Sequence, residues 1–147
     1  MNKNLEYDVE RNIDDIDCFR YECTSDLMSN SINMDVVSEL TLCLYEILVN
    51  IVDHSTIVKN KSEIIDVKLE ITQDKIISTV HYFAPKFDIT QKRINNLEVH
   101  FKEGYNRGLG LFIIQKLMDM VDYKFDDYNN TITIIKNFKK YKSTLTI

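Results

Sequence analysis

The sequence is poor in the residues that usually mark turns, with three glycines and one proline among 147 residues. A globular domain of this size normally contains about ten glycines, scattered along the chain. Here all three fall between positions 104 and 110, in the stretch GYNRGLGLF. The backbone freedom that glycine provides is therefore concentrated in one segment, which makes this segment the first candidate for a functional loop.

Cysteine and long apolar runs are also scarce. The three cysteines are odd in number and lack the spacing of a metal site, which indicates buried thiols in a reducing compartment; they are Cys18, Cys23 and Cys43. The longest apolar run, LTLCLYEILVNIV, is interrupted by Glu46 and Asn50 and is too short to span a bilayer. No signal peptide opens the chain, so we expect a cytoplasmic protein without a membrane segment.

An excess of basic residues is missing as well. The 18 Lys and Arg residues are outnumbered by 23 Asp and Glu residues, and the net charge is −5. A nucleic-acid partner is not expected, because its electrostatic footprint on the protein is absent. The balance of 44% hydrophobic and 28% charged residues is that of a folded globular domain.

The apolar periodicities predict one domain over residues 1–147, with strands and helices in a definite order. We expect an α+β two-layer sandwich, with helices on one face of a mixed, mostly antiparallel sheet. A patternless segment of about 83–107 is expected to be a lid loop, with a possible short helix around 90–97. The predicted elements are a strand in 5–10, helices over 13–27 and 34–53, strands over 65–71 and 76–82, a helix over 109–121, and a closing hairpin of YKFD and TITIIKNF.

Three polar residues interrupt the apolar helix over 34–53 or lie at its end. Glu46, Asn50 and His54 are spaced by four, which places them on one helical face. Burial of a carboxylate without a partner costs several kcal/mol, so such a stripe on an apolar helix indicates contact with water, a metal or a ligand. By spacing alone, a partly exposed polar stripe is an equal alternative.

Gly108 and Gly110 directly precede an apolar helix. Backbone amides at a helix start can bind an anion, and the lack of side chains at the glycines leaves room for a phosphate. A tight helix start also uses glycine, so this pattern alone leaves both interpretations open.

Taken together, the two patterns are more specific. LYEILVNIVDHS resembles the N box of the Bergerat-type ATPase/kinase fold, which histidine kinases, gyrase-type ATPases and anti-sigma-factor serine kinases share. NRGLGLFIIQKLMDMVDYKF followed by NNTITIIKNF is similar to the G2 box and closing strands of the anti-sigma serine/threonine kinases. The resemblance covers roughly residues 5–138, and the short chain fits that branch.

The resemblance implies a bacterial, ATP- and Mg²⁺-dependent regulator of transcription and assigns roles to residues. Glu46 matches the proposed general base, Asn50 the side-chain ligand of Mg²⁺, and His54 a position near the lid end of the nucleotide pocket. The phosphate-binding loop corresponds to Arg107, Gly108, Leu109, Gly110 and Leu111, and the strand behind the adenine carries Thr131 or Thr133.

The adenine-binding G1 box of this family departs from its usual form. In YFAPKFD, Tyr82 replaces the aspartate that accepts the adenine amino group, Ala84 replaces the first glycine, and Lys86 the second glycine or proline. An unpaired adenine donor costs about 1–3 kcal/mol, equivalent to one or two decades of affinity. Tyr82 could hydrogen-bond the base through its hydroxyl, or its ring could fill the pocket.

Two functions remain open on this basis. One is a serine/threonine protein kinase that phosphorylates a small anti-anti-sigma partner and alternatively sequesters a sigma factor. The other is a protein-binding module of the same fold with weak or no nucleotide binding. In the family the first strand and first helix, here about 5–27, form a pairing surface, so we also expect a homodimer or a heteromeric complex.

Overall fold

The computed structural model describes residues 2–86 and 109–138, and within them two helices with asparagine N-caps precede most of the sheet. The Asn12 side chain accepts a hydrogen bond from the Asp15 amide, and Asn33 accepts one from the Asp35 amide, each at 2.8 Å. These caps satisfy amides that a helix start leaves unpaired. The elements in chain order are β1 (Lys3–Val9), α1 (Ile13–Ser29), α2 (Met34–His54), β2 (Ile65–Ile71), β3 (Lys75–Phe83), α4 (Leu109–Leu117), β4 (Met120–Asp126) and β5 (Asn129–Asn137).

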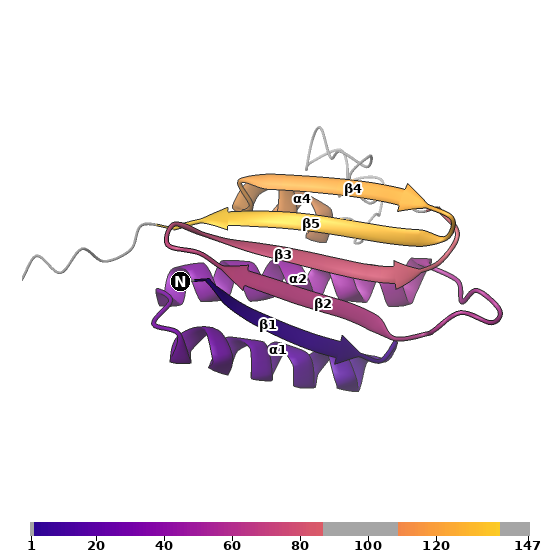
Figure 1. Ribbon diagram of the computed structural model, residues 1–147, viewed down its shortest axis with the longest axis horizontal. Helices are drawn as coiled ribbons and strands as arrows, with labels where there is room; N and C mark the ends of the chain where they lie inside the picture. The colour runs from indigo at the N-terminus through magenta and orange to yellow at the C-terminus, as the bar shows by residue number, and fades with distance from the viewer. Residues whose placement is uncertain (1, 87–108, 139–147) are drawn as a thin grey trace, which may run out of the picture.

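The strands form one sheet in the order β1-β2-β3-β5-β4, and every pairing among them is antiparallel. Helices α1, α2 and α4 lie on the same side of this sheet (Figure 1). The predicted α+β two-layer sandwich with a mostly antiparallel sheet is therefore confirmed. The strand β1 forms one edge of the sheet, and β4 forms the other.

The core lies between the sheet and the helices, because side chains alternate in direction along each strand. On β3 the buried positions are Ile76, Ser78, Val80 and Tyr82, and on β5 they include Asn130, Ile132 and Ile134. The apolar face of α2 packs on these strands, as a broad apolar stripe on a helix favours.

The helix predicted over 109–121 is shorter than expected. It ends at Leu117, because the Asp119 amide donates to the Ile135 carbonyl at 2.8 Å and draws the chain into the sheet. Met120 and Val121 are thus strand residues of β4, and their prediction as helix was wrong. Phe83, placed at the start of the predicted lid, is the last residue of β3. The remainder of that lid from 87, the short helix around 90–97, Arg107 and Gly108 lie outside the described residues.

Tight turns in this glycine-poor chain use other residue types. Among the described residues, four that are not glycine have positive φ, namely Ser31, Asn60, Asp127 and Tyr128. A bulky residue in the left-handed region is strained, and Tyr128 has a φ of 65° in the turn between β4 and β5. Its carbonyl accepts the amide of Ala84 at 3.0 Å, which anchors the turn to the end of β3.

Candidate functional site

The polar stripe of α2, defined by Glu46, Asn50 and His54, lies on the flank of the helix that faces α4. Helices α2 and α4 pack against each other. Glu39 lies on the same flank of α2 as the stripe, and its carboxylate forms an ion pair of 2.6 Å with the ammonium of Lys136 on β5. The Lys136 ammonium also donates to the Leu117 carbonyl at the end of α4, at 2.8 Å. Because Glu46, Asn50 and His54 follow Glu39 at helical spacing, the stripe continues along this flank of α2.

Glu46 is a half-buried carboxylate in the middle of the stripe. Burial raises the pKa of Glu46, and the positive charge of Arg20 on α1 partly opposes this rise. A carboxyl group with a raised pKa accepts a proton more readily near neutral pH than an exposed one does, which suits a general base.

Asn50, one turn further along, carries a buried amide nitrogen (Nδ2) without a hydrogen-bond partner among the described residues. A buried polar atom left unpaired costs about 1–3 kcal/mol, so it points to a binding group that the described residues do not supply. A half-turn of the amide places its oxygen in the same position, where it can ligate Mg²⁺. The residue thus fits the metal-ligand role. His54 is the exposed last residue of α2.

The glycine segment leads into α4. Leu109, Gly110 and Leu111 form its first turn. The last residues of α4 are bound to the C-terminal part of β5, through Lys136 and through the Asp119 amide. The N-terminus of α4 therefore lies away from this part of the sheet. Amides at such a start can bind a phosphate, as the sequence predicted, although the loop that precedes Leu109 is not described.

A second group of residues lies at the end of β3 and on the facing part of β5; we call it the base end and define it as Tyr82, Ala84 and Asn130. The side chain of Tyr82 is fully buried, as is Ala84, and Asn130 lies across from Tyr82 on β5. The Asn130 amide donates to the Ala84 carbonyl at 2.9 Å, and its oxygen accepts the hydroxyl of Tyr123. The polar groups of Asn130 are therefore used within the chain.

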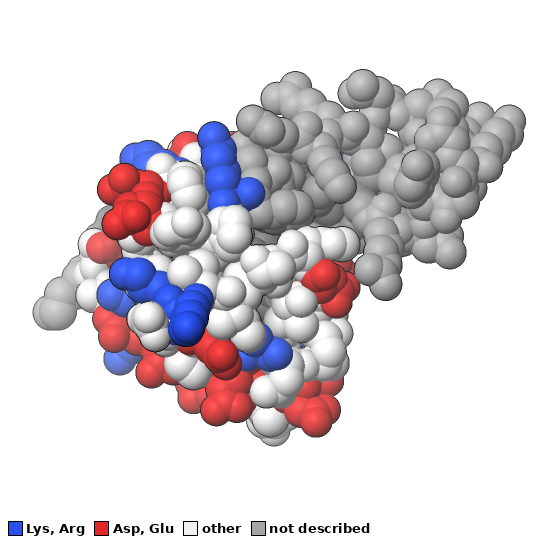
Figure 2. Space-filling view, turned by 90° about the vertical axis from the view of Figure 1, so that its right-hand side faces the viewer, with Lys and Arg blue, Asp and Glu red and all other residues white. Residues whose placement is uncertain are grey.

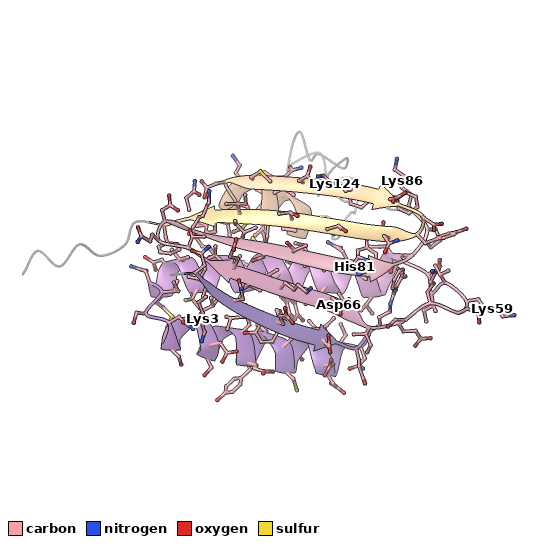
Figure 3. The ribbon with its side chains drawn as sticks, viewed as in Figure 1. Lys3, Lys59, Asp66, His81, Lys86 and Lys124 are labelled. Carbon is pink, nitrogen blue, oxygen red and sulfur yellow. The ribbon has the colours of Figure 1, made fainter. Side chains whose placement is uncertain are left out.

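Thr131 is not brought together with the base end. It lies on the other face of β5, away from the helices, where its neighbour across the strands is His81. His81 lies there beside Asp66, with 3.4 Å between Nδ1 and the Asp66 carboxylate (Figure 3). The residue of β5 that lies across from Tyr82 is Asn130.

One residue at this end was missed by sequence reasoning. Arg11, in the connection between β1 and α1, donates to the Phe83 carbonyl at 2.6 Å and to the Ser55 hydroxyl at 2.7 Å. Its guanidinium carbon lies 5.9 Å from the centroid of the Tyr82 ring. A lone arginine after a strand carries no periodic signal, so only the structure links it to the site. Figure 2 views this end of the molecule, where basic and acidic side chains are intermixed.

Two classes of site find no support in the part of the chain that the structure describes. No group of three or more His, Cys, Asp or Glu side chains there could hold a metal ion. No described helix has the length and apolar character needed to cross a membrane.

Comparison with known proteins agrees with this geometry. Residues 15–136 match the family model described as histidine kinase-like ATPase domain. Two relatives from Staphylococcus aureus, strains RF122 / ET3-1 and MRSA252, each named serine-protein kinase RsbW, are 31% identical over 110 residues, covering 72% of this chain and 69% of each relative.

A solved structure also shares the fold. A chain in the crystal structure of the SiaB-SiaC complex from Pseudomonas aeruginosa aligns with a TM-score of 0.59 and 15% identity, over 91% of this chain and 89% of that one. This likeness concerns the fold alone. The family model and the RsbW relatives show that this chain belongs to the histidine kinase-like ATPase domain family, in the anti-sigma-factor serine/threonine kinase branch.

Proposed function

We propose that this chain is a regulator that phosphorylates a serine or threonine of a small anti-anti-sigma-type protein, with ATP as phosphate donor. The observation that carries the proposal is the stripe on α2, where a half-buried Glu46 lies one turn from an Asn50 whose buried amide nitrogen has no partner among the described residues. A helix bearing such groups next to the start of α4 fits a site for phosphates and a metal.

In this mechanism Glu46 accepts the proton of the partner's hydroxyl group. The hydroxyl oxygen bonds to the terminal phosphorus of ATP as the bond from that phosphorus to the bridging oxygen of the β-phosphate breaks, and ADP leaves. Burial raises the pKa of Glu46, which favours its role as the proton acceptor. Asn50 would hold Mg²⁺, which neutralises phosphate charge when bound.

The partner surface we propose is the edge formed by β1 and α1. Within the described residues β1 pairs only with β2, so its outer side can pair with a further strand. Large side chains on α1 are exposed, with Tyr21 at 81% and Met28 at 48%. This surface suits a homodimer or a complex with the anti-anti-sigma-type protein or a sigma factor. A monomer in light scattering at high concentration, with no co-purifying protein from the native host, would contradict it.

A second candidate function rests on the base end. Tyr82 and Ala84 are fully buried, which favours a ring that fills the adenine position rather than one that reads the base. In that case the chain regulates by protein association alone, with weak or no nucleotide binding.

One experiment separates the two functions. The purified protein is mixed with Mg²⁺, radiolabelled ATP and each anti-anti-sigma-type protein of the native host, and phosphoserine or phosphothreonine is located by mass spectrometry. We expect transfer by the wild type, and loss of transfer with retained partner binding in Glu46→Gln. Partner binding without transfer in the wild type, unchanged when ATP is omitted, would refute the kinase and support the binding module.

A further inference from the structure

Arg11 connects three segments of the base end that are distant in sequence. Its Nη2 donates to the carbonyl of Phe83 at the end of β3, at 2.6 Å, and its Nη1 donates to the hydroxyl of Ser55, the C-cap of α2, at 2.7 Å. Its Nε donates to the carbonyl of Glu63, which precedes β2, at 3.1 Å. One side chain thus ties the helix that carries Glu46 and Asn50 to the strand that carries Tyr82.

These contacts are made by a charge that has been partly withdrawn from water. Among the described residues no carboxylate forms an ion pair with Arg11. Burial lowers the pKa of Arg11, while the Tyr82 and Glu63 groups oppose that change. Hydrogen bonds from a charged donor are stronger than neutral ones, so the carbonyls and the hydroxyl compensate the loss of water. The side chain is therefore held in one position.

That position places the guanidinium next to the Tyr82 ring, at 5.9 Å from its centroid. Across the strands from Tyr82, the Asn130 amide donates to the Ala84 carbonyl and accepts the Tyr123 hydroxyl. The Ala84 amide is bonded to the Tyr128 carbonyl. The Asn130 side chain and the Ala84 backbone thus make their hydrogen bonds within the chain, and a purine would compete with these bonds.

We propose that Arg11 is a positioning residue that keeps Tyr82 in the adenine position, so that this chain accepts nucleoside triphosphates without selecting the base. Arginine suits this task because its rigid fork reaches several acceptors at once, whereas lysine supplies a single point charge. The selectivity part rests on the proposed kinase function; the positioning of Tyr82 by Arg11 does not.

Selectivity is tested by isothermal titration of the wild type with Mg²⁺ complexes of ATP, GTP and inorganic tripolyphosphate. We expect dissociation constants within about threefold of one another, because the phosphates supply the binding. ATP binding more than about tenfold tighter than GTP would overturn the inference, since the base would then be read. If none of the three binds, the proposed function fails instead, and the second experiment decides the role of Arg11.

The second experiment measures nitration of individual tyrosines by tetranitromethane, with peptide mass spectrometry. The exposed Tyr21 provides an internal standard, and the buried Tyr82 should be protected in the wild type. Arg11→Met retains the length of the side chain but removes the three hydrogen bonds, and we expect Tyr82 nitration to rise at least tenfold relative to Tyr21. The same rate as in the wild type would overturn the proposal.

The matched control is Lys61→Met. The Lys61 ammonium lies 5.4 Å from the centroid of the neighbouring Phe83 ring, but it bonds none of the three acceptors of Arg11. Tyr82 should remain protected in this variant; equal exposure in both variants would show a general loosening and would overturn the proposal. If Arg11→Met does not fold, Arg11→Lys takes its place, with an intermediate rise in Tyr82 nitration expected and wild-type protection counting against the inference.

Discussion

Replacement of Asn50 by leucine should stabilise this protein while it weakens Mg²⁺-dependent nucleotide binding. The buried amide nitrogen of Asn50 has no partner among the described residues, and such an atom costs about 1–3 kcal/mol. Leucine has nearly the same shape and a helix propensity better by about 0.5 kcal/mol. The free energy of unfolding should therefore rise by about 1.5–3.5 kcal/mol, equivalent to roughly 5–10 °C in melting temperature for a chain of this length.

The assay compares urea and thermal unfolding of the wild type and Asn50→Leu without nucleotide. Ser38→Leu is the matched control, because Ser38 is exposed on the same helix and should gain only the propensity share, about 0.5 kcal/mol. Titration with Mg-ATP should show at least tenfold weaker binding in Asn50→Leu and no change in Ser38→Leu. If Asn50→Leu proves less stable than the wild type, the amide has a partner in the free protein and the argument for a ligand there fails.

Three further predictions concern other parts of the site. Burial raises the pKa of Glu46, so the stabilisation present at acid pH is lost as the pH rises through that value; Glu46→Gln should be more stable than the wild type at neutral pH and equally stable at acid pH in urea unfolding, and equal stability at both would refute this. Tyr82→Asp with Ala84→Gly should raise ATP affinity by about one to two decades and GTP affinity less, while the urea midpoint falls because two fully buried side chains are cut back; unchanged ATP affinity in a folded double variant would mean that Tyr82 does not face the base. Lys136→Met should lose the contact with the last turn of α4 and cost about 1 kcal/mol, with faster hydrogen exchange confined to α4; unchanged exchange there would contradict the link.

Much of the fold could be predicted because periodicity reports burial directly. The strand over Ile65–Ile71 was predicted with its observed bounds, and both N-terminal helices within about two residues at their ends. The helix over 109–121 was extended too far because Met118, Met120 and Val121 are apolar and fit either period. What ends it is the bond from the Asp119 amide to the Ile135 carbonyl, a contact between separate elements that no local pattern contains.

The candidate site was predictable where its residues follow the period of one helix. Glu46, Asn50 and His54 lie on α2 as expected, whereas Thr131, expected on the strand behind the adenine, lies on the face of β5 away from the helices. Alternation in β5 places Ile132 and Ile134 inside, so Asn130 shares their face and Thr131 does not. That signal was present in the sequence, whereas the three contacts of Arg11 depend on chain segments that only folding brings together.

The two halves of the site differ in how their polar groups are satisfied, and this difference decides what the site can bind. On α2, the buried amide nitrogen of Asn50 has no partner among the described residues, and burial raises the pKa of Glu46. Both features cost free energy until a ligand is present. At the base end, the Asn130 amide and the Ala84 backbone are already bonded within the chain, and a purine would have to displace those bonds before making its own. Binding energy is therefore available for phosphates and a metal, and little is available for the base. On this asymmetry rests the proposal that the chain binds nucleoside triphosphates through their phosphates without selecting the base.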